Sequence, residues 1–395
     1  MSVRQGREFL SIPGPTTIPD AILNAAHRPA IDIYAGSLIA LTASCLDDLK
    51  QIFATRGRTY IYAANGHGAW EAALCNVLCR GDAVLVLESG RFASAWGDMA
   101  AMLGVEVATL AGDWRRAIDP GALEARLRAD AGARIKAVLA VQIDTASGVI
   151  NDIPAIRRAI DAAGHPALLM VDTVASLAVV PFEMDGWGVD VAVAGSQKGL
   201  MMMPGLSFIA AGAKAIDAHG RADLRTRYWD WTARDGDEHY MKYCGTPPEH
   251  LLFALREALD MVLTEGLGQI HRRHAHLAAA VRGAVARWAE GGALAFNIRA
   301  AEERSNAVTT VLMNDGFPPD PLLAYCRDKC AVTLGIGIGD LNGRAFRIAH
   351  MGYVNAPMIL GTLGVVEMAL AALDLPHEPG GVQAAVDVLA RSVPA

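Results

Sequence analysis

Seven short apolar or β-branched runs alternate with amphipathic stretches between residues 58 and 212. Within each run the apolar residues are consecutive, which is typical of strands buried on both faces. The stretches between them, such as 152–164 (DIPAIRRAIDAAG), have helical periodicity and end at a glycine. We therefore predict an α/β fold with a seven-stranded, mostly parallel sheet and helices on both faces. The expected strands are 59–64, 83–89, 105–111, 135–142, 167–173, 189–195 and 206–212.

The pattern changes after residue 248. Two long helical patterns, 248–266 and 267–290, precede a strand-like run at 307–314, a helix near 320–330, a glycine-rich segment at 333–343 and two terminal helices. This order predicts a smaller C-terminal α+β domain. We expect an N-terminal segment at 1–20, a large α/β domain at 21–264 and the small domain at 265–395.

Length and charge narrow the class of protein. A chain of 395 residues is long enough for two domains. The net charge of −7, without a basic block, argues against nucleic acid as a partner. The first residues lack the apolar core of a signal peptide, and no apolar run approaches the roughly 20 residues of a membrane span. We expect a soluble, cytoplasmic protein that does not contact membranes.

The cysteines and histidines raise the question of a metal site. Two pairs of cysteines are spaced four residues apart and can share a helix face: Cys75 with Cys79, and Cys326 with Cys330. None of them forms a CxxC pair. We interpret the cysteines as small core residues in a reducing compartment. No carboxylate or cysteine completes a ligand set around the histidines of 271–276 (HRRHAH). We therefore expect no metal, and we interpret that segment as a polar helix face.

Two charged residues follow neighbouring predicted strands. Asp172 ends the run ALLMVDT, and Lys198 follows the run VDVAVAG in the segment AGSQKG. A lysine in such a place is more often a surface residue when taken alone. An amine and a carboxylate at neighbouring strand ends, however, suit pyridoxal phosphate: the lysine forms an imine, and the aspartate keeps the pyridine nitrogen protonated.

A glycine-bracketed turn provides a third element. The segment 65–74 (NGHGAWEAAL) places this turn at the start of an apolar helix. Free backbone N–H groups and the helix dipole favour an anion there, such as the cofactor phosphate. The turn is weak evidence by itself and gains weight from Asp172 and Lys198.

These segments resemble the alanine/serine–glyoxylate aminotransferase branch of the fold type I pyridoxal-phosphate enzymes. The similarity runs from 13–20 (PGPTTIPD) to 346–352 (FRIAHMG) and is most specific in AIDAAGHPALLMVD and AGSQKGL. The resemblance implies that Lys198 is the lysine that binds the cofactor covalently and that Asp172 is the partner of its ring nitrogen. It further implies a homodimer with shared active sites.

The resemblance also implies further site residues. Around the cofactor these are Gly66 and His67 at the phosphate, Phe92 and Val174 on the two faces of the ring, Thr145 near its 3′-oxygen, and Gln197 at the phosphate or ring oxygen. Tyr243 and Thr246 would reach the phosphate of the neighbouring subunit. Arg347 would bind the substrate α-carboxylate in a bidentate manner. Phe92 could instead be core, Thr145 a turn hydroxyl and Tyr243 interface packing, and His67 could act through its backbone alone.

Two segments depart from this family branch. Where serine– and aspartate–glyoxylate relatives read DHRS, residues 32–35 read DIYA, and where they read HNETATG, residues 142–148 read QIDTASG. Ile33 and Tyr34 therefore replace a basic pair, and Tyr34 becomes a candidate substrate-binding wall. Without that basic pair, binding of a substrate with a second carboxylate is less favourable. The segments IDIYAGS and DTASGVIN look more like pyridoxamine–pyruvate aminotransferase, although NGHG keeps the usual turn at the phosphate position.

We therefore expect a pyridoxal-phosphate-dependent aminotransferase that moves an amino group from a serine- or alanine-type donor to glyoxylate or pyruvate. The alternatives are a pyridoxamine–pyruvate aminotransferase acting on free vitamin B6 and a lyase on the same fold. A desulfurase-type lyase would need a catalytic cysteine on a loop, whereas Cys326 and Cys330 lie in a helical pattern. A non-catalytic anion binder would not need Lys198, Asp172 and Arg347 together. A nicotinamide dehydrogenase is disfavoured because Glu71 stands where GxGxxG needs its third glycine.

Overall fold

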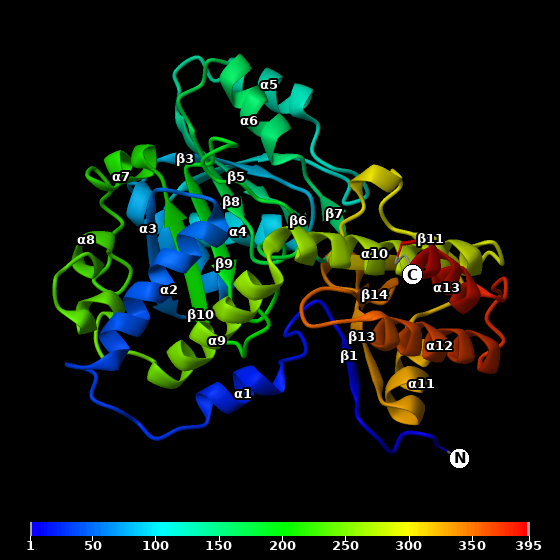
Figure 1. Ribbon diagram of the computed structural model, residues 1–395. Helices are drawn as coiled ribbons and strands as arrows, with labels where there is room; N and C mark the ends of the chain where they lie inside the picture. Colours follow the sequence, from blue (N-terminus) through cyan, green and yellow to red (C-terminus); the bar gives the residue numbers. More distant parts are fainter. Residues whose placement is uncertain (1, 393–395) are drawn as a thin grey trace.

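The computed structural model describes residues 2–392 and contains the predicted seven-stranded sheet (Figure 1). The strand order is β2-β10-β9-β8-β5-β3-β4. Only β10 runs antiparallel to its neighbours β9 and β2, so the prediction of a mostly parallel sheet is confirmed. The strands are β2 (Arg58–Ala63), β3 (Ala83–Leu87), β4 (Glu106–Leu110), β5 (Ile135–Val141), β8 (Leu168–Asp172), β9 (Val191–Gly195) and β10 (Leu206–Ala211).

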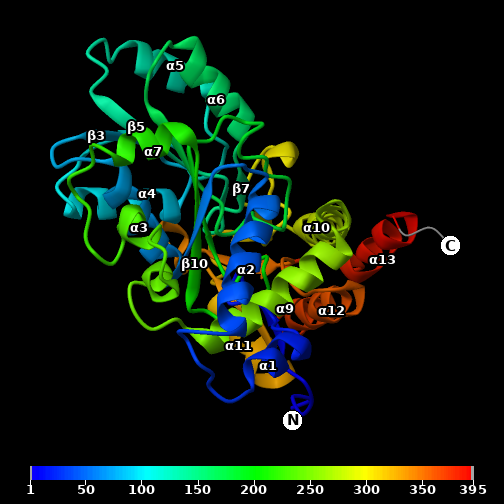
Figure 2. The same ribbon diagram turned by 60° about the vertical axis from the view of Figure 1, so that its left-hand side comes forward.

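Helices cover both faces of this sheet, as predicted (Figures 1 and 2). In β8, Leu168 and Met170 belong to one buried cluster, whereas Leu169 and Val171 belong to another. Successive side chains of a strand point to opposite faces, so consecutive apolar residues mark a strand buried on both sides. The cluster with Leu169 includes α1 (Asp20–Ala26), α2 (Ser37–Phe53), α5 (Pro120–Arg128), α6 (Ile153–Ala162) and α9 (Glu249–Glu265). The other includes α3 (Gly66–Val77), α4 (Arg91–Met102), α7 (Ala213–His219) and α8 (Trp231–Arg234).

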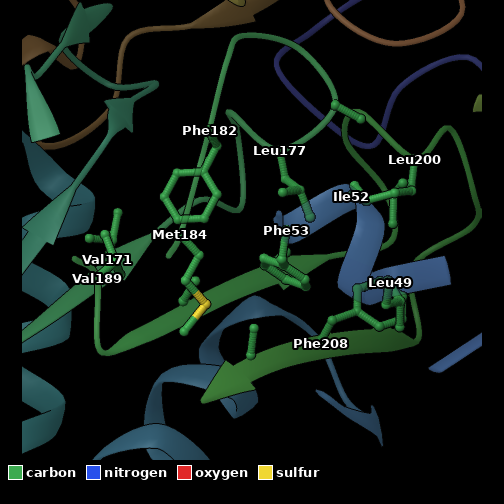
Figure 3. Packing of buried hydrophobic residues seen from close by; sticks show 14 of the residues in the cluster. Leu49, Ile52, Phe53, Val171, Leu177, Phe182, Met184, Val189, Leu200 and Phe208 are labelled. Carbon is green, nitrogen blue, oxygen red and sulfur yellow. The ribbon is translucent and has the colours of Figure 1, made fainter. Parts of the chain in front are cut away.

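Figure 3 shows how α2 packs into the first of these clusters. Leu49, Ile52 and Phe53 come from the last turns of the helix and lie in the same cluster as Phe208 of β10. The ring of Phe53 meets that of Phe182 edge to face, with centroids 6.4 Å apart. This packing holds α2 against the sheet.

One strand differs from its predicted character. The run 105–111 is as apolar as the others, but β4 lies at the edge of the sheet and most of its residues are exposed or half-buried. An edge strand has a partner on one side only, so apolar residues alone did not distinguish it from a central strand.

A second, five-stranded sheet has the order β1-β13-β14-β12-β11. Its strands are β1 (Phe9–Ser11), β11 (Leu294–Phe296), β12 (Val308–Met313), β13 (Val332–Ile336) and β14 (Ala345–Ala349), and β6 (Ile143–Asp144) pairs with β7 (Val149–Ile150) apart from both sheets. Four helices lie at the side of this sheet in Figure 1: α10 (Leu267–Ala289), α11 (Asp320–Cys330), α12 (Ala356–Ala372) and α13 (Gly381–Ser392). The described residues also form short 3-10 helices, which are η1 (His239–Tyr243), η2 (Ala301–Glu303) and η3 (Gly339–Leu341). The expected strand at 307–314 and the helices around it are confirmed.

The N-terminal segment joins this smaller sheet through β1, which pairs in parallel with β13. The sequence had set residues 1–20 apart as a separate segment, and nothing in their pattern indicated this long-range pairing. Between the two sheets, α9 ends at Gly266, whose φ of +80° suits glycine, and α10 begins at once. The division at 264/265 stays a prediction.

Two expectations about cysteine and histidine are wrong in part. Cys79 lies beyond the end of α3 and so does not share a helix face with Cys75. Cys45, Cys75 and Cys326 are buried, but Cys79, Cys244 and Cys330 are partly exposed. The HRRHAH segment lies in α10, yet His274 is buried: its Nδ1 contacts the Ile270 carbonyl at 2.8 Å and its Nε2 accepts from the Gly352 N–H at 2.9 Å. Among residues 2–392, no helix is long and apolar enough to span a membrane.

Candidate active site

The predicted amine and carboxylate meet at the carboxyl edge of the large sheet. Asp172 is the last residue of β8 and pairs with Val193 of the parallel neighbour β9, and Lys198 follows the end of β9. A cavity of about 230 Å³ lies there. Its lining residues come from six separate segments of the chain: Gly14, Gly66, His67, Trp70, Phe92, Ile143, Thr145, Asp172, Val174, Ala175, Gln197 and Lys198.

Lys198 is half-buried, with Nζ donating to the carbonyl of Pro13. A Cβ on Gly14 would lie 2.5 Å from Nζ, and the φ of +98° at this residue also favours glycine. Burial, and after it the charge of Arg347, lower the pKa of Lys198 to about 8, and the charge of Asp172 opposes both effects. A substantial fraction of the amine is therefore neutral near pH 8, and a neutral amine can act as a nucleophile or base.

Asp172 is buried and accepts two hydrogen bonds. The N–H of Val174 donates to Oδ1 at 2.6 Å, and the indole Nε1–H of Trp70 donates to Oδ2 at 3.0 Å. Burial raises the pKa of Asp172 to about 7, and the two hydrogen bonds and Lys198 oppose that rise. The carboxylate can therefore share a proton with a basic nitrogen near neutral pH.

The start of α3 forms the predicted glycine turn, but its N–H groups are not all free. Asn65 caps the helix, and its Oδ1 accepts from His67 N at 3.1 Å and Gly68 N at 3.2 Å. The expectation of free N–H groups is therefore wrong for these two residues. The side chain of His67 lines the cavity and packs on the ring of Trp70, with centroids 4.4 Å apart. Burial, and then the charges of Arg91 and Lys198, lower the pKa of His67.

Asp144, which was not among the predicted site residues, connects two segments that line the cavity. Its buried carboxylate accepts from Phe92 N at 2.9 Å and Ala93 N at 3.1 Å at the start of α4, and from Ala146 N at 3.0 Å. Burial raises the pKa of Asp144 to about 6, and these N–H groups counteract the rise. The carboxylate thus ties the position of Phe92 to the loop that carries Thr145.

Arg347 connects this loop to the smaller sheet. It lies on β14, is 7% exposed, and donates through Nε to Ile336 O at 2.7 Å and through Nη1 to Thr145 O at 3.0 Å. These bonds use two of the five N–H donors of a guanidinium. Burial lowers the pKa of Arg347 to about 10, which still leaves it charged at neutral pH.

The sequence profile described as Aminotransferase class-V matches residues 23–336. The chain belongs to this aminotransferase family. It is 40% identical over 399 residues to the serine–glyoxylate aminotransferase of Methylorubrum extorquens, with 99% of this chain and 98% of that protein covered. It is 36% identical over 378 residues to the L-aspartate–glyoxylate aminotransferase of Paracoccus denitrificans, with 95% and 94% covered. Pyridoxamine–pyruvate aminotransferase from Mesorhizobium loti has a TM-score of 0.90 over 100% of both chains; at 24% identity this shows the fold alone.

A class V aminotransferase is a pyridoxal-phosphate-dependent transaminase, and the cavity fits that cofactor. Within residues 2–392, the Oε1 atom of Gln197 is buried and has no hydrogen-bond partner, so the cavity offers an unused polar contact. The amine of Lys198, which is half-buried, and the buried carboxylate of Asp172 line the same cavity. Phe92 and Val174 add apolar surface for an aromatic ring. The amine, the carboxylate and the two apolar side chains therefore suit a pyridine ring that carries an aldehyde.

Three predicted site residues of the aminotransferase lie away from this cavity. Tyr243 is buried, and its hydroxyl bonds to Thr42 Oγ1 of the same chain at 2.9 Å; its place at the phosphate of a neighbouring subunit stays a prediction. Thr246 is exposed. Tyr34 is 74% exposed and does not line the cavity of its own chain.

Gly14, Trp70 and Asp144 belong to the site but were not predicted from the sequence. Trp70 follows His67 by three residues in a predicted helix, a spacing that places both on one face, so its position beside the turn could have been inferred. Asp144 directly precedes Thr145 in a motif that had been compared with relatives. For Gly14 the available signal was the PGP sequence at 13–15, but its contact with Lys198 depends on tertiary structure.

Proposed function

We propose that this aminotransferase transfers the amino group of a small monocarboxylate donor, of the serine or alanine type, to glyoxylate or pyruvate. The main support is the convergence of three groups: Lys198 and Asp172 line one cavity, and Arg347 holds the backbone of Thr145 at its wall. The name of the relative that is 40% identical, a serine–glyoxylate aminotransferase, favours the same donor and acceptor.

When bound, pyridoxal phosphate supplies an aldehyde to which an amine can be attached and a ring that withdraws electrons. The Nζ of Lys198 takes the proton from the donor Cα and returns a proton during product formation. The carboxylate of Asp172 holds the proton of the ring nitrogen. The N–H groups of Arg347 that are not bonded to backbone carbonyls bind the substrate α-carboxylate. The turn at Gly66 and His67 accommodates the phosphate beside a helix N-terminus.

A donor panel tests this proposal. Serine, alanine, aspartate, glycine and pyridoxamine are assayed with glyoxylate and with pyruvate, except for the identity pairs glycine–glyoxylate and alanine–pyruvate, and the new keto acid or aldehyde is measured. Serine or alanine should give the highest kcat/KM. Pyridoxamine as the best donor would instead support the vitamin B6 alternative, and keto-acid formation without an acceptor would indicate a lyase.

We expect kcat/KM for serine to exceed that for aspartate. A distal carboxylate left unpaired in a partly dry pocket costs several kcal/mol, and Arg347 would already be engaged by the α-carboxylate. Tyr34 and Ile33 would supply bulk and no charge. A tenfold preference for aspartate, about 1.4 kcal/mol of transition-state binding, would contradict this prediction. Comparing serine with aspartate is informative because a relative at 36% identity is an L-aspartate–glyoxylate aminotransferase.

If aspartate proves to be a good donor, Arg91 is the first candidate for the cation that binds its distal carboxylate. It begins α4, lies close enough to lower the pKa of His67, and makes only an exposed contact with Asp98 at 3.4 Å. Arg91→Met should then reduce aspartate turnover selectively. Arg344→Met is the matched control, since Arg344 lines a different cavity between the two sheets.

We also propose that the active unit is a homodimer with shared sites, located in the cytoplasm. Exposed apolar side chains gather on two segments that contact each other through His239 Nδ1 and Ile33 O at 3.0 Å: Tyr34 and Ile39 on one, Tyr228 and Tyr240 on the other. Such surface favours association with another subunit. The free thiols of the described residues fit a reducing compartment.

Subunit mixing tests the shared site. Lys198→Ala and Thr246→Ala subunits are expected to be weakly active or inactive alone, because each lacks a group that every site needs. In a hybrid dimer one of the two sites is free of both changes, so mixing should restore part of the activity. Mixing each variant with itself is the control. An active monomer in sedimentation at assay concentration would contradict the proposal.

A further inference from the structure

The indole of Trp70 makes a hydrogen bond that packing alone does not require. Its Nε1–H donates to Asp172 Oδ2 at 3.0 Å inside the buried site. The same ring packs against His67 at 4.4 Å between centroids and stacks on Trp96 at 5.9 Å and 17°. Trp70 is 2% exposed, so its ring and its single donor are held in one orientation.

Trp96 provides an internal comparison. It is fully buried in the same stack, but its Nε1 has no hydrogen-bond partner within residues 2–392. Both rings therefore contribute apolar packing, and the N–H of Trp70 alone reaches the carboxylate. A buried indole N–H usually finds a partner, so the contact with Asp172 distinguishes the role of Trp70 from that of Trp96.

The carboxylate of Asp172 has one donor on each oxygen. Val174 N serves Oδ1 at 2.6 Å and belongs to the backbone, whereas the donor to Oδ2 is a side chain. Each carboxylate oxygen can accept two hydrogen bonds, so Oδ2 keeps a lone pair for a further donor. A hydrogen bond to the ionised form favours that form, which opposes the effect of burial on the pKa of Asp172.

We propose that Trp70 is a positioning residue that orients Asp172 and keeps it ionised, so that a cofactor ring nitrogen beside it remains protonated. This inference rests on the proposed role of Asp172 in the transaminase. Without the indole N–H, the proton shared by the ring nitrogen and the carboxylate shifts toward the carboxylate. The ring then withdraws electrons less strongly, and proton removal from the donor slows.

The test compares Trp70→Phe with Trp96→Phe in the cofactor-loaded enzyme. Both remove an indole from the stack, but only the first removes a donor to Asp172. Pyridoxal phosphate labelled with ¹⁵N in its ring is bound to each protein, and the nitrogen chemical shift reports its protonation. In Trp70→Phe the signal should move toward the unprotonated value. In Trp96→Phe it should match that of the wild-type enzyme.

Binding and kinetics provide readouts that packing loss would not reproduce. Trp70→Phe should raise the cofactor dissociation constant of the apoenzyme about tenfold, as for loss of a hydrogen bond to a charged group. It should lower kcat by a similar factor while leaving the donor KM within twofold, since Arg347, which binds the donor, is untouched. Trp96→Phe should leave all three values within twofold.

A second replacement keeps the test decisive if Trp70→Phe does not fold. β-(3-Benzothienyl)alanine at position 70 has the shape of tryptophan with sulfur in place of the N–H, and it should reproduce the shift and the fall in kcat. The proposal is overturned if a folded, loaded protein with either replacement keeps the wild-type nitrogen shift, cofactor affinity and kcat. Asp172→Asn is measured in parallel. An unchanged shift there would refute the role of Asp172 itself, and with it that of Trp70.

Discussion

Lys198→Ala is expected to lower kcat by at least about 10³-fold, because a positioned base alone contributes about 10²–10⁴-fold. The variant also loses the amine that attaches the cofactor. The structure supports a special role for this amine, since it lines the cavity beside Gly14 and desolvation there lowers its pKa to about 8. Turnover of the best donor from the panel, at saturating pyridoxal phosphate, provides the measurement.

A matched lysine separates loss of chemistry from loss of charge. Lys136 is exposed near the amino end of β5, at the opposite edge of the same sheet, and Lys136→Ala should retain the wild-type kcat. Borohydride treatment of the wild-type enzyme should leave the cofactor covalently attached to the peptide that contains Lys198. Attachment to any other lysine would show that the covalent site has been assigned to the wrong residue.

Asp172→Asn is expected to lower kcat by about 10²- to 10³-fold, because removing one member of a buried charge pair typically costs about 3–5 kcal/mol. The amide keeps the size of the side chain but has no negative charge to hold a proton on the ring nitrogen. Since Asp172 lies away from the groups that bind donor carboxylate, the donor KM should change much less than kcat.

Asp190→Asn is the control for this substitution. Asp190 is also buried, and burial raises its pKa, but it lies before β9, at the other edge of the sheet, where it accepts from Leu169 N at 2.7 Å. Its replacement should reduce thermal stability and leave kcat close to that of the wild-type enzyme. A kcat for Asp172→Asn within threefold of wild type would exclude the proposed role.

Much of the large domain could be predicted from local patterns. Consecutive apolar residues in 167–173 and 189–195 indicated strands buried on both faces, and β8 sends its side chains into two clusters as expected. Because these strands are parallel neighbours, the residues that follow them meet at one edge. The placement of Asp172 near Lys198 was therefore determined by the sequence before any tertiary contact was known.

Other features depended on which distant segments meet. The side chain of Asn65 accepts hydrogen bonds from the N–H groups of His67 and Gly68, and the hydroxyl of Tyr243 bonds to Thr42. The strand β1 joins a sheet whose other strands lie more than 280 residues later in the chain. A pattern of apolar and polar residues reports whether a position is buried, because burial follows local periodicity. It does not report which partner a buried donor finds, because that partner comes from another element.

Trp70 and Trp96 illustrate this division most clearly. Both lie in helices that pack on the sheet, and both are buried in one stack. Only the tertiary structure decided that one N–H meets Asp172 while the other has no partner in the described part of the chain. Hydrophobic burial is non-directional and can be inferred from composition along the chain, whereas a hydrogen bond requires two atoms within about 3 Å and a defined angle.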